Sequence, residues 1–319
     1  MMEIDRLTVE YFMGKAASIK AVDNVSLKIP TKGYTLGLVG ESGSGKTSLG
    51  MSIVNSIEPP GRITGGSINY NREDVLKLSS ERLRLYKWKE VSMVYQSAMN
   101  SLNPVKTVSD HLIEVMQQHM PISKSEAREK SLELLSQVGI RAERARDYQH
   151  QLSGGMRQRV VIAMALALSP KMLIADEPTS ALDVVVQRQI LSLLKKNVIE
   201  RNLSLIFITH EIAILHGLVD NLAVMYKGEI VESGPLNDIM REPFHPYTEM
   251  LLDSLLTIDE ANTSTGTTKV VFDSVSEKGD QNYCKYVYNC KYAFDRCRKV
   301  RPTLVEVSNG RSVSCHKYN

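Results

Sequence analysis

The sequence lacks any cysteine before residue 284 and has no apolar run long enough to cross a bilayer. Its longest apolar run, VVIAMALAL from Val160, has less than half of the ~20 residues that a membrane-spanning helix needs, and it therefore predicts a buried helix. The N-terminal stretch MMEIDRLTVE is acidic and alternating, unlike a signal peptide. We therefore expect a cytoplasmic chain, where reducing conditions make a cysteine cluster more suited to metal than to disulfides.

A strong charge of either sign is also missing from most of the chain. The net charge is +3, but residues 281–319 carry eight Lys or Arg against Asp295 and Glu306, which gives this segment +6 and leaves residues 1–280 at −3. An acidic body lacks the basic surface that nucleic-acid binding needs. Only the C-terminal segment offers a local basic excess.

A phosphate-binding motif lies near the N-terminus, in TLGLVGESGSGKTSLG from Thr35. A β-type apolar run precedes the spacing G-x-x-x-x-G-K-T and a helix-like segment follows it, which is the context that a P-loop requires. The N–H groups of the loop and the start of the helix would bind phosphate oxygens. Lys46 would reach the β- and γ-phosphates, and the Thr47 hydroxyl would bind Mg²⁺. The residues expected to contact the nucleotide here are Gly40, Ser42, Gly43, Ser44, Gly45, Lys46, Thr47 and Ser48.

A pair of carboxylates follows a second apolar strand, in KMLIADEPTSALD. This strand would deliver Asp176 and Glu177 to its carboxyl end, where ligands bind in open α/β sheets. Asp176 suits the Mg²⁺ shell, and Glu177 suits activation of the attacking water. Such a pair is common after strands, and it takes this meaning from the P-loop upstream.

Between these motifs lies LSGGMRQR, in which Ser153, Gly154 and Gly155 open a helix and offer an anion site. Together the three motifs resemble the nucleotide-binding subunits of ATP-binding-cassette (ABC) transporters. The resemblance covers residues 1 to about 250. It implies that Ser153, Gly154 and Gly155 face the γ-phosphate held by a second subunit, in a head-to-tail dimer that encloses ATP and Mg²⁺.

The resemblance also implies roles for residues that match the family's other motifs. Gln96, in MVYQSAMNSLNP, matches the Q-loop, which touches Mg²⁺ or water and connects to the membrane subunits. Asp183, the last residue of SALD, matches the D-loop across the dimer, and His210, the last residue of SLIFITH, matches the switch histidine. Tyr11 resembles the aromatic residue that stacks on adenine, with Phe12 as the alternative register. The catalytic set implied is Glu177, His210, Lys46 and Gln96.

The implied fold is α/β, a P-loop NTPase of the ABC type with a RecA-like core, an antiparallel β subdomain and a helical subdomain. We expect the nucleotide-binding domain over residues 1–250, with the helical subdomain inserted at about 97–170. Within it, SKSEAREKSLELLSQVG predicts a helix with a capping box at Ser123 and Glu126. A polar linker over 251–283 would then lead to a small cysteine-rich module over 284–319.

The string PFHPYT at residues 243–248 resembles the ATPases of dipeptide and oligopeptide importers. This implies an energy-coupling ATPase, peripheral at the cytoplasmic face of the membrane, that pairs with a paralogous ATPase or a second copy of itself. Two permease subunits would bind it, an extracytoplasmic solute-binding protein would act indirectly, and no nucleic acid is expected. Because His245 lies beside two prolines, we expect it to fix a turn rather than to bind a ligand.

The four cysteines, Cys284, Cys290, Cys297 and Cys315, have the spacing C-x5-C-x6-C-x17-C. This spacing matches neither the C-x2-C knuckles of structural zinc nor the ferredoxin run. Peptide-importer ATPases often end in a module of this layout, which in some members carries a [4Fe–4S] cluster. The resemblance alone favours [4Fe–4S] over Zn²⁺, and disulfides or free thiols remain open.

Other functions stay open at this stage. A soluble ABC ATPase acting on nucleic acid would usually have coiled-coil inserts, tandem cassettes or a basic body, and the sequence has none of these. An importer ATPase could also serve an oligosaccharide or a metal, because components outside this chain select the cargo. The intact Glu177 argues against a regulatory subunit without turnover. ATP rather than GTP follows from the resemblance alone.

Overall fold

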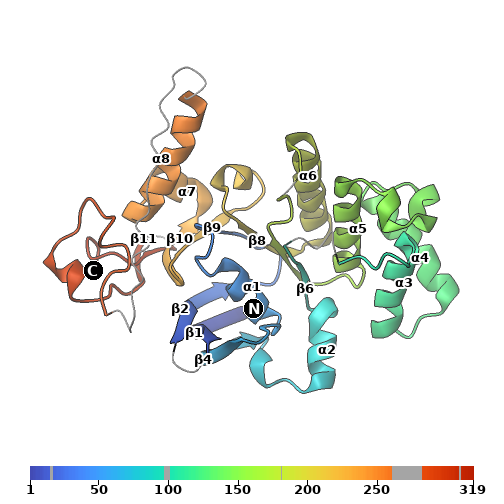
Figure 1. Cartoon of the computed structure of the whole chain (residues 1–319), viewed down its shortest axis with the longest axis horizontal. Helices are drawn as coiled ribbons and strands as arrows, with labels where there is room; N and C mark the ends of the chain where they lie inside the picture. The colour runs from blue at the N-terminus through green and yellow to red at the C-terminus, as the bar shows by residue number, and fades with distance from the viewer. Residues whose placement is uncertain (15–16, 97–100, 181, 261–281, 309) are drawn as a thin grey trace.

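The structure is a computed structural model of the chain, and it describes all residues except 15–16, 97–100, 181, 261–281 and 309. A central sheet has the strand order β11-β12-β10-β9-β3-β8-β7-β6, and an antiparallel sheet has the order β2-β1-β4-β5 (Figure 1). The central strands are β3 (Thr35–Val39), β6 (Val91–Val94), β7 (Met172–Asp176), β8 (Ser204–Thr209), β9 (Asn221–Tyr226), β10 (Glu229–Pro235), β11 (Val305–Ser308) and β12 (Arg311–Val313). The antiparallel strands are β1 (Met2–Met13), β2 (Ala17–Ile29), β4 (Gly61–Tyr70) and β5 (Glu73–Asp74).

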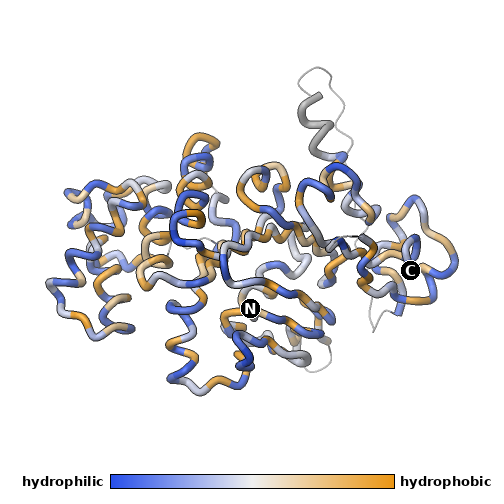
Figure 2. The backbone as a smooth tube through the Cα atoms, turned by 180° about the vertical axis from the view of Figure 1, so that it is seen from behind, coloured by the Kyte–Doolittle hydropathy of each residue, from blue (hydrophilic) through white to orange (hydrophobic). Residues whose placement is uncertain are grey.

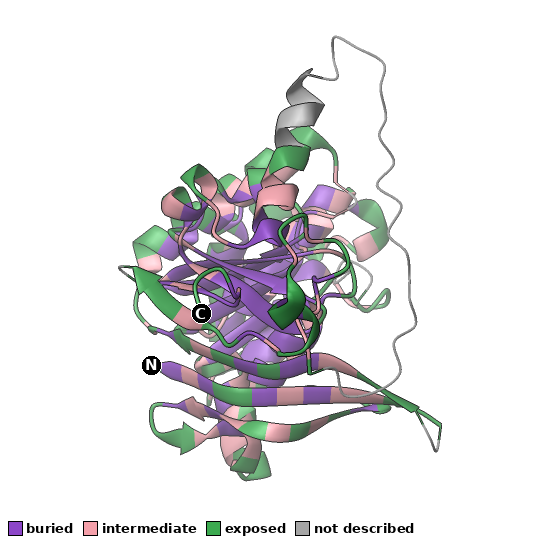
Figure 3. Ribbon diagram, turned by 90° about the vertical axis from the view of Figure 1, so that its left-hand side faces the viewer, coloured by how far each residue is buried: buried purple, intermediate pink, exposed green. Residues whose placement is uncertain are grey.

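Strands β6, β7, β8, β3 and β9 pair in parallel, and their side chains alternate between two apolar cores. In β8, Leu205 and Phe207 join the core that includes side chains of α5 and α6, whereas Ile206 and Ile208 join the core that includes β1, β2 and α1. Because both faces are covered, these strands are mainly apolar, and Figure 3 shows the central sheet as largely buried. The helices named here are α1 (Lys46–Ile53), α5 (Gly154–Leu166) and α6 (Val184–Arg201).

The region between β6 and β7 is mainly helical. Helix α4 begins with the predicted capping box, in which the Glu126 N–H donates to Ser123 Oγ and the Ser123 N–H donates to the Glu126 carboxylate. It ends before Gly139, whose φ of 73° is the left-handed conformation that glycine tolerates. Figures 1 and 2 place this helical region and the cysteine-rich region at opposite ends of the long axis. The helices involved are α3 (Val108–His119), α4 (Lys124–Gln137) and α5.

The remaining helices connect these layers. No helix in the described part of the chain is long and apolar enough to cross a membrane. These remaining helices are α2 (Ser80–Lys89), α7 (Leu236–Arg241) and α8 (Pro246–Glu260). Short 3₁₀ turns lie at Val75–Lys77, Ala142–Arg146, Gln149–Gln151, Ile212–Leu215 and Asp295–Arg298.

The C-terminal region is part of the central sheet. Strand β12 pairs with β10, and β11 pairs with β12, so the cysteine-rich segment extends the sheet of the nucleotide-binding domain. Helix α8 continues to Glu260, ten residues beyond position 250, where we expected the domain to end. The rest of the expected linker lies mostly outside the described residues.

Ion pairs also hold this region to the core. Lys285 and Arg301 both contact Asp23 on β2 and Glu229 on β10, at 2.8 to 3.0 Å. Arg311 on β12 pairs with Glu232 at 3.1 Å, and the guanidinium lies 3.5 Å from the ring centroid of Phe244. Lys291 also pairs with Glu249 on α8 at 2.8 Å, so four of the eight cations in the basic segment have acidic partners outside that segment.

The Arg311–Glu232 pair provides a test of this attachment. Glu232 is fully buried and also accepts the Phe244 and His245 N–H groups, so Arg311→Met leaves a buried carboxylate without its counter-ion. We expect the free energy of unfolding to fall by about 3–5 kcal/mol, as measured by chemical denaturation. The exposed Arg298→Met should change it by less than about 0.5 kcal/mol. Equal stability of the two variants would contradict an attachment of this kind.

Candidate nucleotide-binding site

The P-loop joins β3 to α1 and needs glycine at three positions. Gly40, Gly43 and Gly45 have φ values of 151°, 80° and 102°. A Cβ atom on Gly40 would lie 2.1 Å from the Met225 carbonyl oxygen, and one on Gly45 would lie 1.9 Å from the Ala21 carbonyl oxygen. The loop can therefore take this path only without side chains at Gly40 and Gly45, whereas Gly43 is favoured by its left-handed φ alone.

Lys46 is turned into the loop. Its Nζ donates to the carbonyl oxygens of Gly40 and Glu41, both at 2.7 Å, and to Ser44 Oγ at 3.3 Å. Burial lowers the pKa of Lys46, and the carboxylates of Glu177, Asp176 and Glu41 oppose that shift. The ammonium is thus held by backbone acceptors at the place where phosphate oxygens would approach.

The two carboxylates lie at the carboxyl end of β7, beside β8. Glu177 has a φ of 43°, and its N–H donates to the Ile208 carbonyl oxygen at 2.9 Å. Its side chain is held on both oxygens, because His210 Nδ1 lies 2.9 Å from Oε1 and Gln96 Nε2 donates to Oε2 at 3.0 Å. The parallel pairing of β6, β7 and β8 brings these three residues together from three strands.

Asp176 is buried, with 1 % of its surface exposed. Burial raises the pKa of its carboxyl to about 6, and the Thr47 hydroxyl and Lys46 act in the opposite direction. Neither oxygen has a hydrogen bond of ordinary geometry to the described residues. A buried carboxylate without a partner, next to a threonine hydroxyl, is a donor set that fits Mg²⁺.

A cleft opens at the P-loop and contains most of the predicted contact residues. It is lined by Ala21, Gly40, Glu41, Ser42, Gly43, Gly45, Lys46, Thr47, Ser48, Gln96, Glu177, His210 and Leu251. Ala21 and Leu251 were not predicted, since an alanine in β2 and a leucine in α8 have no chemical signature that marks them. Glu41 was also missed, although its position within the P-loop motif could have identified it.

Besides Tyr11, six predicted contacts do not line this cleft: Ser44, Ser153, Gly154, Gly155, Asp176 and Asp183. Ser153 caps α5 by accepting the Met156 N–H, and Asp183 caps α6 by accepting the Val186 N–H. A Cβ atom on Gly155 would lie 2.4 Å from Val186 Cγ1, so this glycine permits close packing of the two helix starts. Neither Ser153, Gly154 nor Gly155 lines the cleft of its own chain.

Tyr11 packs beside α1 and does not line the cleft at the P-loop. Its hydroxyl lies 3.2 Å from Ser48 Oγ, and the side chain packs against the core between β1 and α1. A Cβ atom on Gly61 would lie 2.8 Å from the Tyr11 ring, which shows how closely β4 covers it. Phe12 is exposed beside Arg62. Neither aromatic residue lines the cleft, so stacking stays a prediction that this geometry does not favour.

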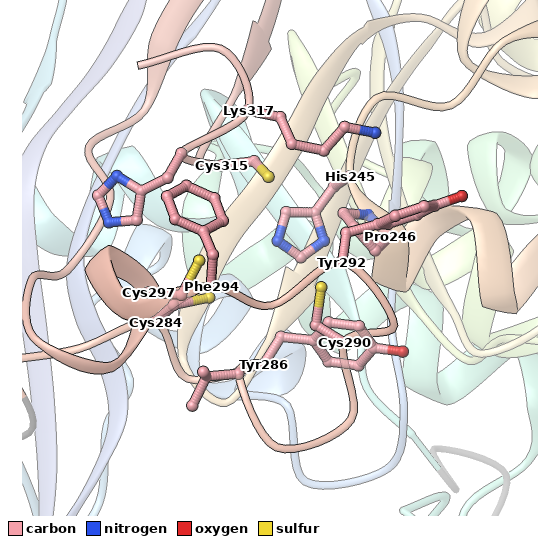
Figure 4. A pocket seen from close by; sticks show the side chains of 12 residues that line it. His245, Pro246, Cys284, Tyr286, Cys290, Tyr292, Phe294, Cys297, Cys315 and Lys317 are labelled. Atoms are coloured by element: carbon pink, nitrogen blue, oxygen red, sulfur yellow. The ribbon is translucent and has the colours of Figure 1, made fainter.

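The four cysteines line one pocket at the C-terminal end of the molecule (Figure 4). His245 lines the same pocket, but its ring Nδ1 accepts the Tyr247 N–H and its backbone N–H donates to the Glu232 carboxylate. These contacts hold it at the start of α8 and favour a structural role over that of a ligand. Burial lowers the pKa of His245 to about 3, so the ring is neutral. The cysteines in this pocket are Cys284, Cys290, Cys297 and Cys315.

Burial in this apolar pocket favours the protonated thiols, and backbone N–H groups oppose that shift only in part. Burial raises the pKa of Cys284 to about 12 and raises the pKa of Cys290 and Cys315 as well. Each of these three sulfurs also accepts a backbone N–H from the residue two positions later, which lowers its pKa. Across the described residues, no group of three or more His, Cys, Asp or Glu has the arrangement that holds one metal ion.

Residues 22–180 match the protein family described as "ABC transporter", and residues 231–297 match the family described as "Oligopeptide/dipeptide transporter, C-terminal region". Two similar proteins extend this match over the chain. The Oligopeptide transport ATP-binding protein AppD of Bacillus subtilis (strain 168) is 40 % identical, covering 100 % of this chain and 97 % of that protein. The Dipeptide transport ATP-binding protein DppD of Escherichia coli (strain K12) is 40 % identical, covering 99 % and 96 %.

Solved structures agree with the fold. The ATP-binding cassette MJ0796, solved as a dimer in a post-hydrolysis state with ADP and Pi, is 29 % identical, with a TM-score of 0.66, and the match covers 74 % of this chain and 99 % of that chain. The cbiO1 protein of Clostridium perfringens, described as part of the ABC transporter complex cbiONQ, is 24 % identical and has a TM-score of 0.64, over 82 % and 96 %. These likenesses confirm the expected fold class.

The raised pKa of Asp176 predicts a pH-dependent stability in the absence of nucleotide and Mg²⁺. A carboxyl whose pKa is near 6 in the folded state and 3.8 in the unfolded state stabilises the fold when protonated, and that contribution is lost as pH rises. We expect the free energy of unfolding of the wild type, relative to Asp176→Asn, to fall by about 1 kcal/mol between pH 5 and pH 7.5. Denaturant titrations at both pH values measure this difference, and a pH-independent difference would contradict it.

Proposed function

The chain belongs to the ATP-binding subunits of ABC transporters, in their oligopeptide/dipeptide branch, and from this premise we propose that it powers an importer of dipeptides or oligopeptides. As a member of this family it is an ATPase. The observation that carries the proposal is Glu177, held by Gln96 and His210 opposite an intact P-loop. The full-length likeness to AppD and DppD, both described as peptide transport proteins, supports the cargo.

The nucleotide would bind with its phosphates against the P-loop. The loop N–H groups and the start of α1 would hold phosphate oxygens, and Lys46 would move its ammonium from the loop carbonyls to the β- and γ-phosphates. Thr47 and Asp176 would bind Mg²⁺, which supplies positive charge to the β- and γ-oxygens. Glu177 would accept a proton from the attacking water, while His210 and Gln96 fix its carboxylate.

A second cassette would complete the site. Ser153 and Asp183 are exposed and lie outside the cleft of their own chain, as residues that serve a partner's nucleotide should. The partner would be a paralogous ATPase or a second copy. Two permease subunits would bind the helical region through a helix-in-groove contact, placing the chain at the cytoplasmic face of the membrane. A solute-binding protein would take part only through the permeases.

The cysteine pocket would hold a [4Fe–4S] cluster, with Zn²⁺ as the alternative. Four cysteine side chains that line one pocket support a group bound through sulfur. Such a group would stabilise a region with few large apolar residues. The pocket lies beyond β10, away from Glu177, so we assign it a structural or redox-sensing role outside ATP hydrolysis.

The role of Glu177 is tested by Glu177→Gln. Glutamine has nearly the same size and shape but lacks the carboxylate that would accept the proton. We expect steady-state ATP hydrolysis to fall by at least ~100-fold, since general-base catalysis contributes that much. The variant should accumulate as an ATP-bound dimer in size-exclusion chromatography with its cassette partner. Glu200→Gln, an exposed change on α6, is the matched control. Unchanged turnover in Glu177→Gln would exclude Glu177 as the base.

The metal assignment is tested by anaerobic purification with the membrane partners. We expect visible absorption of an iron–sulfur cluster and comparable amounts of iron and sulfide. Cys284→Ser should lose the absorption while keeping ATP turnover, and Ser308→Ala in the same region should keep both. Detection of zinc without sulfide would show that the site binds Zn²⁺ in place of an iron–sulfur cluster. Loss of ATP turnover in a folded Cys284→Ser variant would contradict a role outside ATP hydrolysis.

A further inference from the structure

Tyr247 contacts the P-loop from outside the cleft. Its hydroxyl accepts the Glu41 N–H at 3.0 Å, across 206 positions of sequence. Tyr247 is the first residue after Pro246 in α8, and its side chain does not line the cleft. Tyr247 therefore contacts the backbone of the P-loop without lining the cleft where the phosphates would bind.

This hydrogen bond fixes one particular peptide plane. The Glu41 N–H and the Gly40 carbonyl belong to the same trans peptide unit, in which the two groups point in opposite directions. The N–H is held by Tyr247 at 3.0 Å, and the carbonyl oxygen accepts from Lys46 Nζ at 2.7 Å. Rotation of this plane would break both bonds together, so Tyr247 sets the direction of an acceptor that holds Lys46.

Tyr247 is itself held from several sides. It has no exposed surface, and its ring lies 4.5 Å from the Tyr226 ring and 5.5 Å from the Tyr286 ring, measured between centroids. Its N–H donates to His245 Nδ1 at 3.1 Å. Burial raises the pKa of the Tyr247 hydroxyl well above its usual value, so it stays neutral. Because β9, α8 and the C-terminal region all contribute to this cluster, the hydroxyl has a defined position.

We propose that Tyr247 is a positioning residue for nucleotide binding, acting through the Gly40–Glu41 peptide on Lys46. The role rests on the ATPase function and adds to it a residue that touches neither nucleotide nor metal. Without the hydroxyl, a partly buried N–H loses its acceptor and the peptide plane loses its orientation. Because the contact prepares the loop for the phosphates, its loss acts mainly on nucleotide affinity.

The test compares Tyr247→Phe with Tyr286→Phe in the full-length protein with its cassette partner. Both variants lose one hydroxyl from the same aromatic cluster, but only Tyr247 bonds to the P-loop. Calorimetric titration with magnesium and a non-hydrolysable ATP analogue should give a Kd about 5- to 10-fold higher for Tyr247→Phe. The KM for ATP should rise by the same factor, and kcat should change less than about twofold. Tyr286→Phe should match the wild type.

Amide hydrogen exchange supplies a second readout. The Glu41 amide should be protected in the wild type and exchange faster in Tyr247→Phe, but not in Tyr286→Phe. Equal Kd values for the two variants, or an unprotected Glu41 amide in the wild type, would overturn the role of Tyr247. A wild-type protein that failed to bind the analogue would overturn the ATPase assignment itself, and this proposal with it.

Discussion

The parallel pairing of β3, β8, β7 and β6 is the constraint on which the nucleotide site depends. Because neighbouring parallel strands end at the same edge, Gly40, His210, Glu177 and Gln96 meet there although they are spread over 171 positions of sequence. The strands can hold this order because both faces of the sheet are covered by apolar side chains. The chemistry of the site is therefore a product of strand order more than of any single loop.

Buried charge is handled in two ways. Lys46 donates to carbonyl oxygens that phosphate oxygens could replace. The Asp176 carboxyl, with a pKa of about 6, can be protonated when no cation is bound. In the C-terminal region, by contrast, Glu232 meets a permanent cation, Arg311, which fixes a junction between strands. The charged groups in the nucleotide site thus have contacts that a ligand can replace, whereas the Arg311–Glu232 ion pair joins β12 to β10.

Much of this arrangement could be predicted from the sequence, because motifs with a fixed residue spacing require a particular local backbone structure. The P-loop, the Asp-Glu pair after an apolar strand and the capping box at Ser123 all lie on the expected elements. The attachment of β11 and β12 to β10 could not be predicted, since strands of four and three residues are too short to give a reliable pattern. Tyr247 and Leu251 were missed for another reason: their contacts cross more than 200 positions, and no local pattern reports them.

Strand β12 has a consequence for any shortened form of the protein. A fragment that stopped after α8 would keep every residue proposed to contact the nucleotide, but the outer side of β10 would expose unpaired N–H and C=O groups. Such an edge invites strands from neighbouring molecules and promotes aggregation. In the full chain β12 pairs with Glu232 and Ser233 on that side of β10, and β11, four residues long and largely polar in its exposed positions, lies outermost on this side of the sheet. The C-terminal strands thereby protect the molecule from intermolecular sheet formation.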